Sequence, residues 1–374
     1  MKSLRINCDD KRNSSIELLR IISMIMIIFH HFALHGGFDY NSTAITIPKL
    51  WWNFIIMGGK IGVNIFILIS GYFLISNTKI ELNYRKILKL WGQVIFYSLM
   101  VLLLYFIFNN SIDFKMIIKS LFPITFSLWG FASTYFVLYL MHPFINRLLQ
   151  NLSKKEFEFF LGLQFCCWCI IPTLTGQLFQ SNSLIWFIFL YSVASYIKIN
   201  GITNNKKTRF YFIAFIVFSI LTYLSSVVFS VLGLKWGFFA NHSRYFFGPE
   251  KISIFLISVA LFMTFVSLKL PYYKWINKIA STTFGIYLLH DNPFIRDFLW
   301  SKLFQNNVFQ NSNFIIPYSI IVCCLVFIFG CIIDLIRQEI VKIVFKSNVV
   351  KFLTKNIKSQ IEKVKKTYIN IIKN

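Results

Sequence analysis

Ten apolar stretches of about twenty residues each follow one another along the chain, and they constrain the fold more than any other feature. A helix of this length matches the thickness of a bilayer core. With 56% hydrophobic residues, the chain is also too apolar for a soluble domain of 374 residues. The sequence therefore predicts an all-α fold, a polytopic transmembrane helical bundle. The predicted spans are roughly 16–35, 52–75, 86–108, 131–149, 157–174, 184–199, 209–231, 251–268, 280–300 and 314–336.

The basic residues lie mostly between the spans, and their uneven distribution predicts the orientation. Alternate connecting segments, from 1–15 to 337–374, hold 28 of the 38 Lys and Arg residues, whereas the other connecting segments hold 8. Segments rich in Lys and Arg stay in the cytoplasm, so both termini are predicted to be cytoplasmic. The net charge of +24 is then a signal of topology, and we expect no nucleic-acid partner.

We divide the chain into a membrane domain, 1–336, and a basic tail, 337–374. The tail carries apolar residues at helical spacing among its lysines, which is typical of an amphipathic helix on the anionic cytoplasmic leaflet. Membrane lipids are therefore expected partners. Six of the seven cysteines lie inside apolar runs, where we interpret them as small core residues rather than disulfides or metal ligands. We predict no metal site and no bound cofactor.

The first span carries the ionisable residues Glu17, Arg20, His30, His31 and His35. Such residues are costly in a bilayer, so function is the default interpretation. On a helix, Arg20 and His31 point ~20° apart and lie ~16 Å apart along the axis. Glu17 and His35 fall near the same face, while His30 points elsewhere. The alternative is that Arg20 extends to the membrane surface and His31 makes an interhelical hydrogen bond.

The second span adds polar groups at two depths. Lys60 and Asn64 lie deep, and Lys60 is either a functional cation facing His31 or a side chain that extends outward to the interface. Ser70 and Gly71 lie near the inner surface, at about the depth of Arg20.

Three basic residues, Arg85, Lys86 and Lys89, open the third span. Topology alone explains each of them singly. Together with Arg20 they could form an anion site at the cytoplasmic surface.

Two further places carry polar groups, and both are predicted to lie towards the outer side. The loop 232–251 interleaves aromatic residues with charged ones and includes Trp236, His242, Arg244 and Tyr245. An aromatic interface belt explains much of it, and a polar ligand stacked on these rings is the alternative. The ninth span is broken at Pro293, beside His290, Asp291 and Asn292, and such breaks occur where backbone lines a cavity.

In the fourth span, His142 before Pro143 predicts a kink stabilised by a histidine hydrogen bond.

The chain resembles acyltransferase family 3, the bacterial integral-membrane acyltransferases that O-acetylate surface polysaccharides. Its most specific element is Arg-x10-His, here Arg20 and His31. GVNIFILISGYFL resembles the family's glycine-valine-acidic-aromatic-serine-glycine stretch, with Asn64 where an acidic residue is common. Arg85-Lys86 resembles the following basic cluster. STYFVLYLMHPFIN and TTFGIYLLHDNPF resemble later landmarks of the family.

The resemblance implies an O-acetyltransferase of the bacterial cytoplasmic membrane that uses acetyl-CoA as donor. Its acceptor would be a hydroxyl of a cell-surface polysaccharide or exopolysaccharide, or of its lipid-linked precursor, with polysaccharide-biosynthesis machinery as a possible partner. His31 would act as general base, or would itself be acetylated transiently. The expected catalytic residues are His31, Arg20 and Glu17. The expected donor-binding residues are Arg20, Ser70, Gly71, Arg85, Lys86 and Lys89. The expected acceptor-side residues are Lys60, Asn64, Trp236, His242, Arg244, Tyr245, His290 and Asp291.

Two other functions fit the same spans. A flippase or transporter of lipid-linked sugars would use Arg20 and His31 to bind cargo without chemistry, but the chain shows no paired halves. A polysaccharide polymerase would be expected to carry a larger outer loop than any found here.

Overall fold

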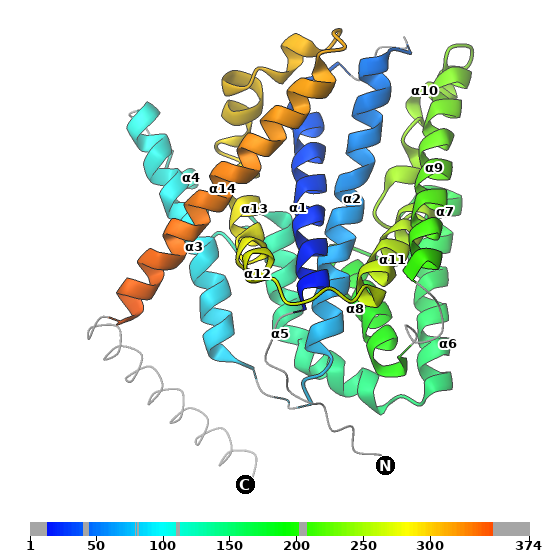
Figure 1. The fold of residues 1–374 in the computed structure, drawn as a ribbon, viewed down its shortest axis with the longest axis vertical. Coiled ribbons are helices and arrows are strands. Elements are labelled where there is room, and N and C mark those ends of the chain that lie inside the picture. Colours follow the sequence, from blue (N-terminus) through cyan, green and yellow to red (C-terminus); the bar gives the residue numbers. More distant parts are fainter. Residues whose placement is uncertain are drawn as a thin grey trace.

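A computed structural model describes residues 13–39, 45–78, 80, 82–109, 113–201 and 208–346 of the protein. These residues form helices and connecting turns without any strand. The long helices run side by side as a bundle (Figure 1). The α-helices are α1 (Ser14–His35), α2 (Ile47–Leu74), α3 (Tyr84–Asn109), α4 (Phe114–Leu121), α5 (Gly130–Asn151), α6 (Lys154–Phe165), α7 (Ile171–Thr175), α8 (Ser183–Asn200), α9 (Thr208–Gly233), α10 (Gly237–Asn241), α11 (Ile252–Ser267), α12 (Lys274–Ala280), α13 (Thr283–His290) and α14 (Ile315–Lys346). This arrangement confirms the predicted helical membrane bundle.

Eight helical stretches of the described chain are long and apolar enough to cross a bilayer, and they match eight of the ten predicted spans to within a few residues, except that the stretch Gly237–Ser267 begins earlier and the stretch Ile315–Val344 ends later. The predicted span 131–149 corresponds to α5, a 22-residue helix that is not among these eight. The predicted span 280–300 is not one helix but α12, α13 and a π-helical turn, Phe298–Leu303. The predicted break is confirmed, because α13 ends at His290.

Helix α1 lies in the middle of the bundle and contacts α2, α11, α12, α13 and α14 (Figure 1). Asn13 caps its first turn, since its side-chain oxygen accepts from the Ser15 and Ile16 amides. The Ser15 hydroxyl donates to the Leu268 carbonyl at 2.6 Å, and the Ser14 hydroxyl accepts from the Tyr273 amide at 2.9 Å. These bonds fix the start of α1 against the segment between α11 and α12.

Two glycines of α2 bring its backbone close to α1. A Cβ on Gly59 would collide with the His30 side chain, and a Cβ on Gly62 would lie 2.7 Å from the Ser23 carbonyl. Small residues allow such contacts between membrane helices, where dispersion rather than water drives packing. The two glycines therefore let α1 and α2 pack at close range.

The histidine hydrogen bond that was predicted beside the proline of α5 is present in the structure. Pro143 has no amide hydrogen, so the Tyr139 carbonyl one turn earlier loses its usual helical donor. The His142 Nδ1 atom bonds to that same carbonyl, and the imidazole is buried. This histidine therefore satisfies the backbone of its own helix.

A buried network joins α14 to α3. The Asp334 carboxylate is fully buried and pairs with Arg337 at 2.7 Å, and it accepts from the Tyr97 hydroxyl at 2.8 Å and the Gln93 amide at 3.2 Å. Burial of a charged pair is tolerated when the remaining polar positions are satisfied, as they are here. Helix α14 continues to Lys346, past the predicted domain boundary at 336, and the remaining tail, 347–374, lies outside the described residues.

Candidate functional site

One face of α1 connects two polar regions. Arg20, Met24, Ile27 and His31 recur at helical spacing along it, with a cation at one end, an imidazole at the other and two apolar side chains between them. Arg20 lines a cleft, whereas His31 meets a second histidine from α13. The structure therefore gives the two ends of the face different surroundings.

The cleft at the Arg20 end has a volume of about 240 Å³ and is lined by side chains of α1, α2, α3, α5 and α13. Three of these, Arg20, Lys86 and Lys89, are basic, and none is acidic. Ser70 also lines it and donates to the Phe66 carbonyl at 2.9 Å. The nearby carboxylate of Glu17 lies 3.8 Å from Arg20 Nε. A partly enclosed pocket with this charge would attract a polyanion such as a phosphate ester.

Two of the expected donor-site residues do not line this cleft. The Arg85 Nε atom donates to the Tyr84 hydroxyl at 3.4 Å, and Arg85 is exposed. Gly71 packs against α8, where an added Cβ would lie 2.7 Å from the Tyr191 carbonyl. In this structure Gly71 contributes close helix packing, not a cleft wall.

Two hydrogen bonds set the tautomers of the histidines at the other end of α1. His290 Nδ1 lies 2.6 Å from the Ile286 carbonyl, which can only accept, so Nδ1 of His290 is the donor. In a neutral His290, Nε2 is then an acceptor, and it lies 3.0 Å from His31 Nδ1. His31 must therefore donate through Nδ1, which leaves its Nε2 as the basic nitrogen. The backbone of α13 thus dictates which atom of His31 can accept a proton.

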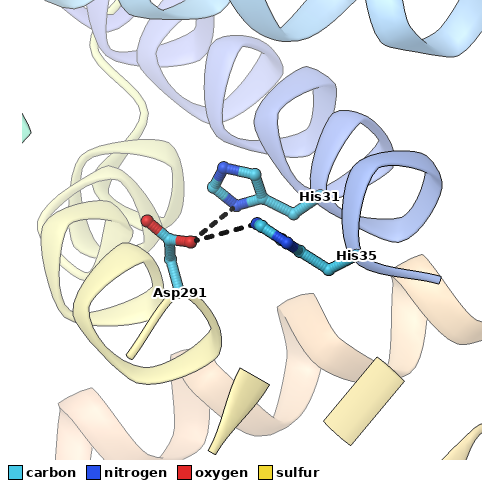
Figure 2. Close-up of side chains that lie close together, drawn as sticks. All are labelled: His31, His35 and Asp291. Atoms are coloured by element: carbon cyan, nitrogen blue, oxygen red, sulfur yellow. Dashed lines mark ion pairs between the residues drawn. The ribbon is translucent and has the colours of Figure 1, made fainter. Parts of the chain in front are cut away.

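Asp291 gathers positive and titratable groups around one carboxylate oxygen. Its Oδ1 atom lies 3.8 Å from His31 Nδ1, 3.7 Å from His35 Nε2 and 3.8 Å from Arg296 Nη1. Figure 2 shows His31 and His35 reaching from the same helix towards this carboxylate. The Tyr287 side chain also faces Asp291. An anion this close would stabilise a positive charge on His31 when it takes a proton.

The ligand atoms of His31, His35 and Asp291 all lie within 4.8 Å of one another, a spacing that could hold a metal ion. Two observations oppose that use. His31 Nδ1 is already bonded to His290, and the Arg296 cation lies beside the carboxylate oxygen that a metal would need. A divalent cation would have to displace both contacts, so we assign no metal here.

His30 and Lys60 lie beside this cluster. His30 turns to α2, where its Nδ1 bonds to the Ile56 carbonyl at 2.7 Å. Lys60 is partly buried and lies within electrostatic reach of His30, Asp291 and Glu250. Of the two interpretations of Lys60, its position favours a cation near the histidine cluster.

Asn64 joins three elements instead of facing a cavity. Its amide donates to the Pro249 carbonyl at 2.9 Å, and its oxygen accepts from the Trp186 indole at 3.0 Å. Asn64 is fully buried. A carboxylate at this position would lack the N–H donor that bonds to the Pro249 carbonyl. The asparagine, which stands where the resembled family commonly has an acidic residue, therefore has a structural role in this chain.

The aromatic loop 232–251 meets the membrane core mainly at its last residues. The Tyr245 hydroxyl donates to the Thr173 carbonyl at 2.8 Å, and its ring lies under the Lys251 ammonium. His242 stacks on Phe238 with ring centroids 4.3 Å apart. Trp236 is exposed, and Arg244 lies within electrostatic reach of Lys49. The loop therefore packs against α7 and α2. Its Glu250 lies within electrostatic reach of Lys60, which in turn lies beside the histidine cluster.

Several residues at these sites were not singled out in the sequence. Tyr287 and Arg296 approach Asp291, and Gln93 and Tyr135 line the cleft. Met24 and Ile27 lie on α1 between Arg20 and His31. The α1 pair could have been found, because both lie on the stripe that joins Arg20 to His31. The others carry no local signal, since common aromatic and amide residues become part of a site only through helix packing.

A basic cleft lies at one end of α1, and at its other end His31 pairs with His290 of α13. These features define the class: a helical membrane protein with several spans that holds a basic cleft and a candidate proton acceptor in one bundle. The family model described as an acyltransferase domain, acyltransferase 3, matches residues 13–335, nearly the whole chain, and the protein belongs to that family. It is an acyltransferase with several membrane-spanning helices. No curated protein and no solved structure matches the chain.

Proposed function

We propose that the protein transfers an acetyl group from acetyl-CoA to a hydroxyl of a cell-surface polysaccharide, or of its lipid-linked precursor, in the bacterial cytoplasmic membrane. The observation that supports this most is the α1 face with a basic cleft at Arg20 and a tautomer-fixed base at His31. These lie ~16 Å apart along the helix. This separation suits a donor with phosphates at one end and a thioester at the end of a flexible arm.

The donor's phosphates would lie in the cleft. Arg20 presents a planar fork that pairs with phosphate oxygens, and Lys86 and Lys89 add two further charges. The cleft lies at the end of α1 that the Lys and Arg distribution predicts to face the cytoplasm. Acetyl-CoA is a cytoplasmic anion, so its charge and its compartment both fit.

In the proposed reaction, His31 Nε2 accepts the proton of the acceptor hydroxyl as its oxygen attacks the thioester carbonyl. The carbon–sulfur bond then breaks, and the proton on the imidazolium passes to the departing thiolate. The products are the acetyl ester and CoA with a free thiol. While His31 is charged, Asp291 at 3.8 Å offsets the charge, and His290 holds Nδ1.

The acceptor would enter from the His290 side of the bundle, where Lys60 and the end of the 232–251 loop lie. Mass spectrometry of the envelope glycan, with and without the gene product, tests this assignment. We expect one acetyl group per repeat to disappear when the protein is absent. An unchanged glycan mass would contradict acyl transfer to the envelope, and a missing group other than acetyl would contradict the donor.

Direct CoA binding to the full-length protein in detergent tests the donor site. Arg20→Ala should weaken binding by about tenfold or more, because a charge-assisted hydrogen bond to phosphate is lost. Arg20→Lys should restore part of this loss, since Lys cannot make the bidentate contact.

Arg85→Ala is the matched control, because this substitution removes the same charge from a side chain that faces Tyr84 rather than the cleft. It should have the smaller effect. Equal binding by the wild type and Arg20→Ala would overturn the donor assignment.

A further inference from the structure

A small, partly enclosed cavity lies on the α1 face between the cleft and the histidines. Its volume is about 20 Å³, and its walls include Met24 and Ile27 of α1 and Val63 of α2. Ile27 precedes His31 by four residues, so the cavity lies about 6 Å, or one helical turn, from the histidine along the axis. Tyr287, which faces Asp291, forms part of the same wall.

Three phenylalanines separate this cavity from the cleft. Phe66, Phe131 and Phe284 line both spaces, and the Phe66 and Phe131 rings meet edge to face with centroids 6.3 Å apart. The rings come from α2, α5 and α13. A donor arm that runs from the cleft to His31 must therefore pass these rings and arrive at the cavity.

The walls of the cavity select an apolar guest. A space of this size holds about one group the size of a water molecule, and water is stable in a cavity only with two or more polar partners. The cavity offers aliphatic and aromatic carbon instead, so a methyl group is the better occupant. Each additional methylene would need room that the surrounding side chains fill.

We propose that this cavity receives the methyl end of the donor's acyl group, with the thioester carbonyl beside His31, and that it restricts the acyl group to acetyl. The inference rests on the proposed function and assigns the cavity, which that function leaves without a role. Val63 and Met24 are then residues that determine specificity. Their size, not the charge of the cleft, decides which acyl-CoA reacts.

A competition between two donors tests this. Permeabilised membranes from cells that produce the full-length protein receive equal concentrations of acetyl-CoA and propionyl-CoA, and the acyl groups on the envelope glycan are released and counted. The wild type should prefer acetyl by roughly 10–200-fold, the usual effect of one methylene in an apolar pocket. Val63→Ala should reduce that preference by about tenfold, and Met24→Ala should act in the same direction.

Val217→Ala is the matched control, because it makes the same substitution on the exposed surface of α9. It should leave the donor preference at the wild-type value. Val63→Leu, which fills the cavity, should lower acetyl transfer while CoA binding stays unchanged, and CoA binding also shows that each variant is folded.

The outcomes separate this inference from the function on which it rests. If the wild type transfers acetyl but Val63→Ala and Met24→Ala keep the preference of Val217→Ala, the cavity does not select the acyl group and the inference alone is overturned. A wild type that uses propionyl-CoA as well as acetyl-CoA has the same consequence. A wild type that transfers neither group contradicts the proposed function as well.

Discussion

His30 and His31 are neighbours in the chain, but their side chains meet different helices. His30 bonds to the Ile56 carbonyl of α2 and is buried, whereas His31 bonds to His290 of α13. The difference follows from the ~100° turn between successive residues of a helix. The two residues therefore offer a sharp test of which histidine carries the chemistry.

His31→Ala should reduce acyl transfer by about a hundredfold or more, the usual contribution of a general base. Membrane insertion and CoA binding should persist, because His31 lies far from the cleft along α1. His30→Ala should mainly reduce thermal stability in detergent, since it removes a side chain packed against α2. Initial rates and melting temperatures of both variants check this, and a larger rate loss for His30→Ala would contradict the helix-face assignment.

His290 acts in this scheme as a positioning residue, because it touches His31 and not the reacting atoms. His290→Gln keeps a side-chain oxygen that can accept from His31 Nδ1, whereas His290→Leu leaves that buried donor without an acceptor. We therefore expect transfer to fall much further in His290→Leu than in His290→Gln, with equal CoA binding in both.

The measurement is the acyl-transfer rate at saturating acetyl-CoA for the two variants side by side. Equal losses in His290→Gln and His290→Leu would mean that His290 only fills space.

At the scale of elements, the contact between α1 and α2 sets the direction in which the functional face of α1 points. Gly59 lies under the His30 side chain, and Gly62 lies against Ser23 and Ile27. Ile27 and His31 lie on the same helix, so a shift of α1 relative to α2 would move both side chains together relative to α13. The glycines of α2 thus influence the site without touching a substrate.

Gly59→Ala should destabilise the protein by about 1–3 kcal/mol, the usual cost of overpacking a close contact. Gly58→Ala is the control one residue away, because its Cβ would meet the nearest Met26 atom at an ordinary 3.5 Å. Thermal unfolding in detergent should show a lower midpoint for Gly59→Ala alone. Equal midpoints for the two variants would mean that α2 can shift at Gly59 without cost.

At the scale of the whole molecule, the proposal needs the donor and the acceptor to approach α1 from its two opposite ends. The basic cleft lies at the Arg20 end, and the histidine cluster lies at the other end. The distribution of Lys and Arg predicts that the Arg20 end faces the cytoplasm. That orientation is a prediction from charge and has a direct test.

A thiol reagent that cannot cross membranes should label a cysteine introduced by Gln177→Cys from outside the cell, and one introduced by Lys155→Cys only after permeabilisation. Both residues are exposed, and they lie near opposite ends of the helical stretch Lys154–Thr175. The native cysteines are replaced first, so that only the introduced thiol reacts. The reverse labelling pattern would invert the topology and place the cleft outside.

Sequence pattern predicted the helical bundle, the break after His290 and the hydrogen bond of His142 beside Pro143 in α5, because apolar length and proline chemistry act locally. It also placed Arg20 and His31 on one face. It did not separate Lys86 and Lys89, which line the cleft, from Arg85, which does not. All three sit within one short basic segment, and only the packing of α3 decides which side chains turn inward.

Local sequence pattern is enough to assign what each helix carries: a bilayer-length apolar segment, and on the first helix a cation and an imidazole on one face. Those properties depend on residues a few positions from one another and on the fixed geometry of the α-helix. The contact between His31 and His290, 259 residues further along the chain, arises only when the helices pack, and through it the backbone of α13 fixes the basic atom of His31. That pairing depends on how far α13 is rotated against α1, and helix rotation is set by packing against several neighbours at once, which no local pattern encodes.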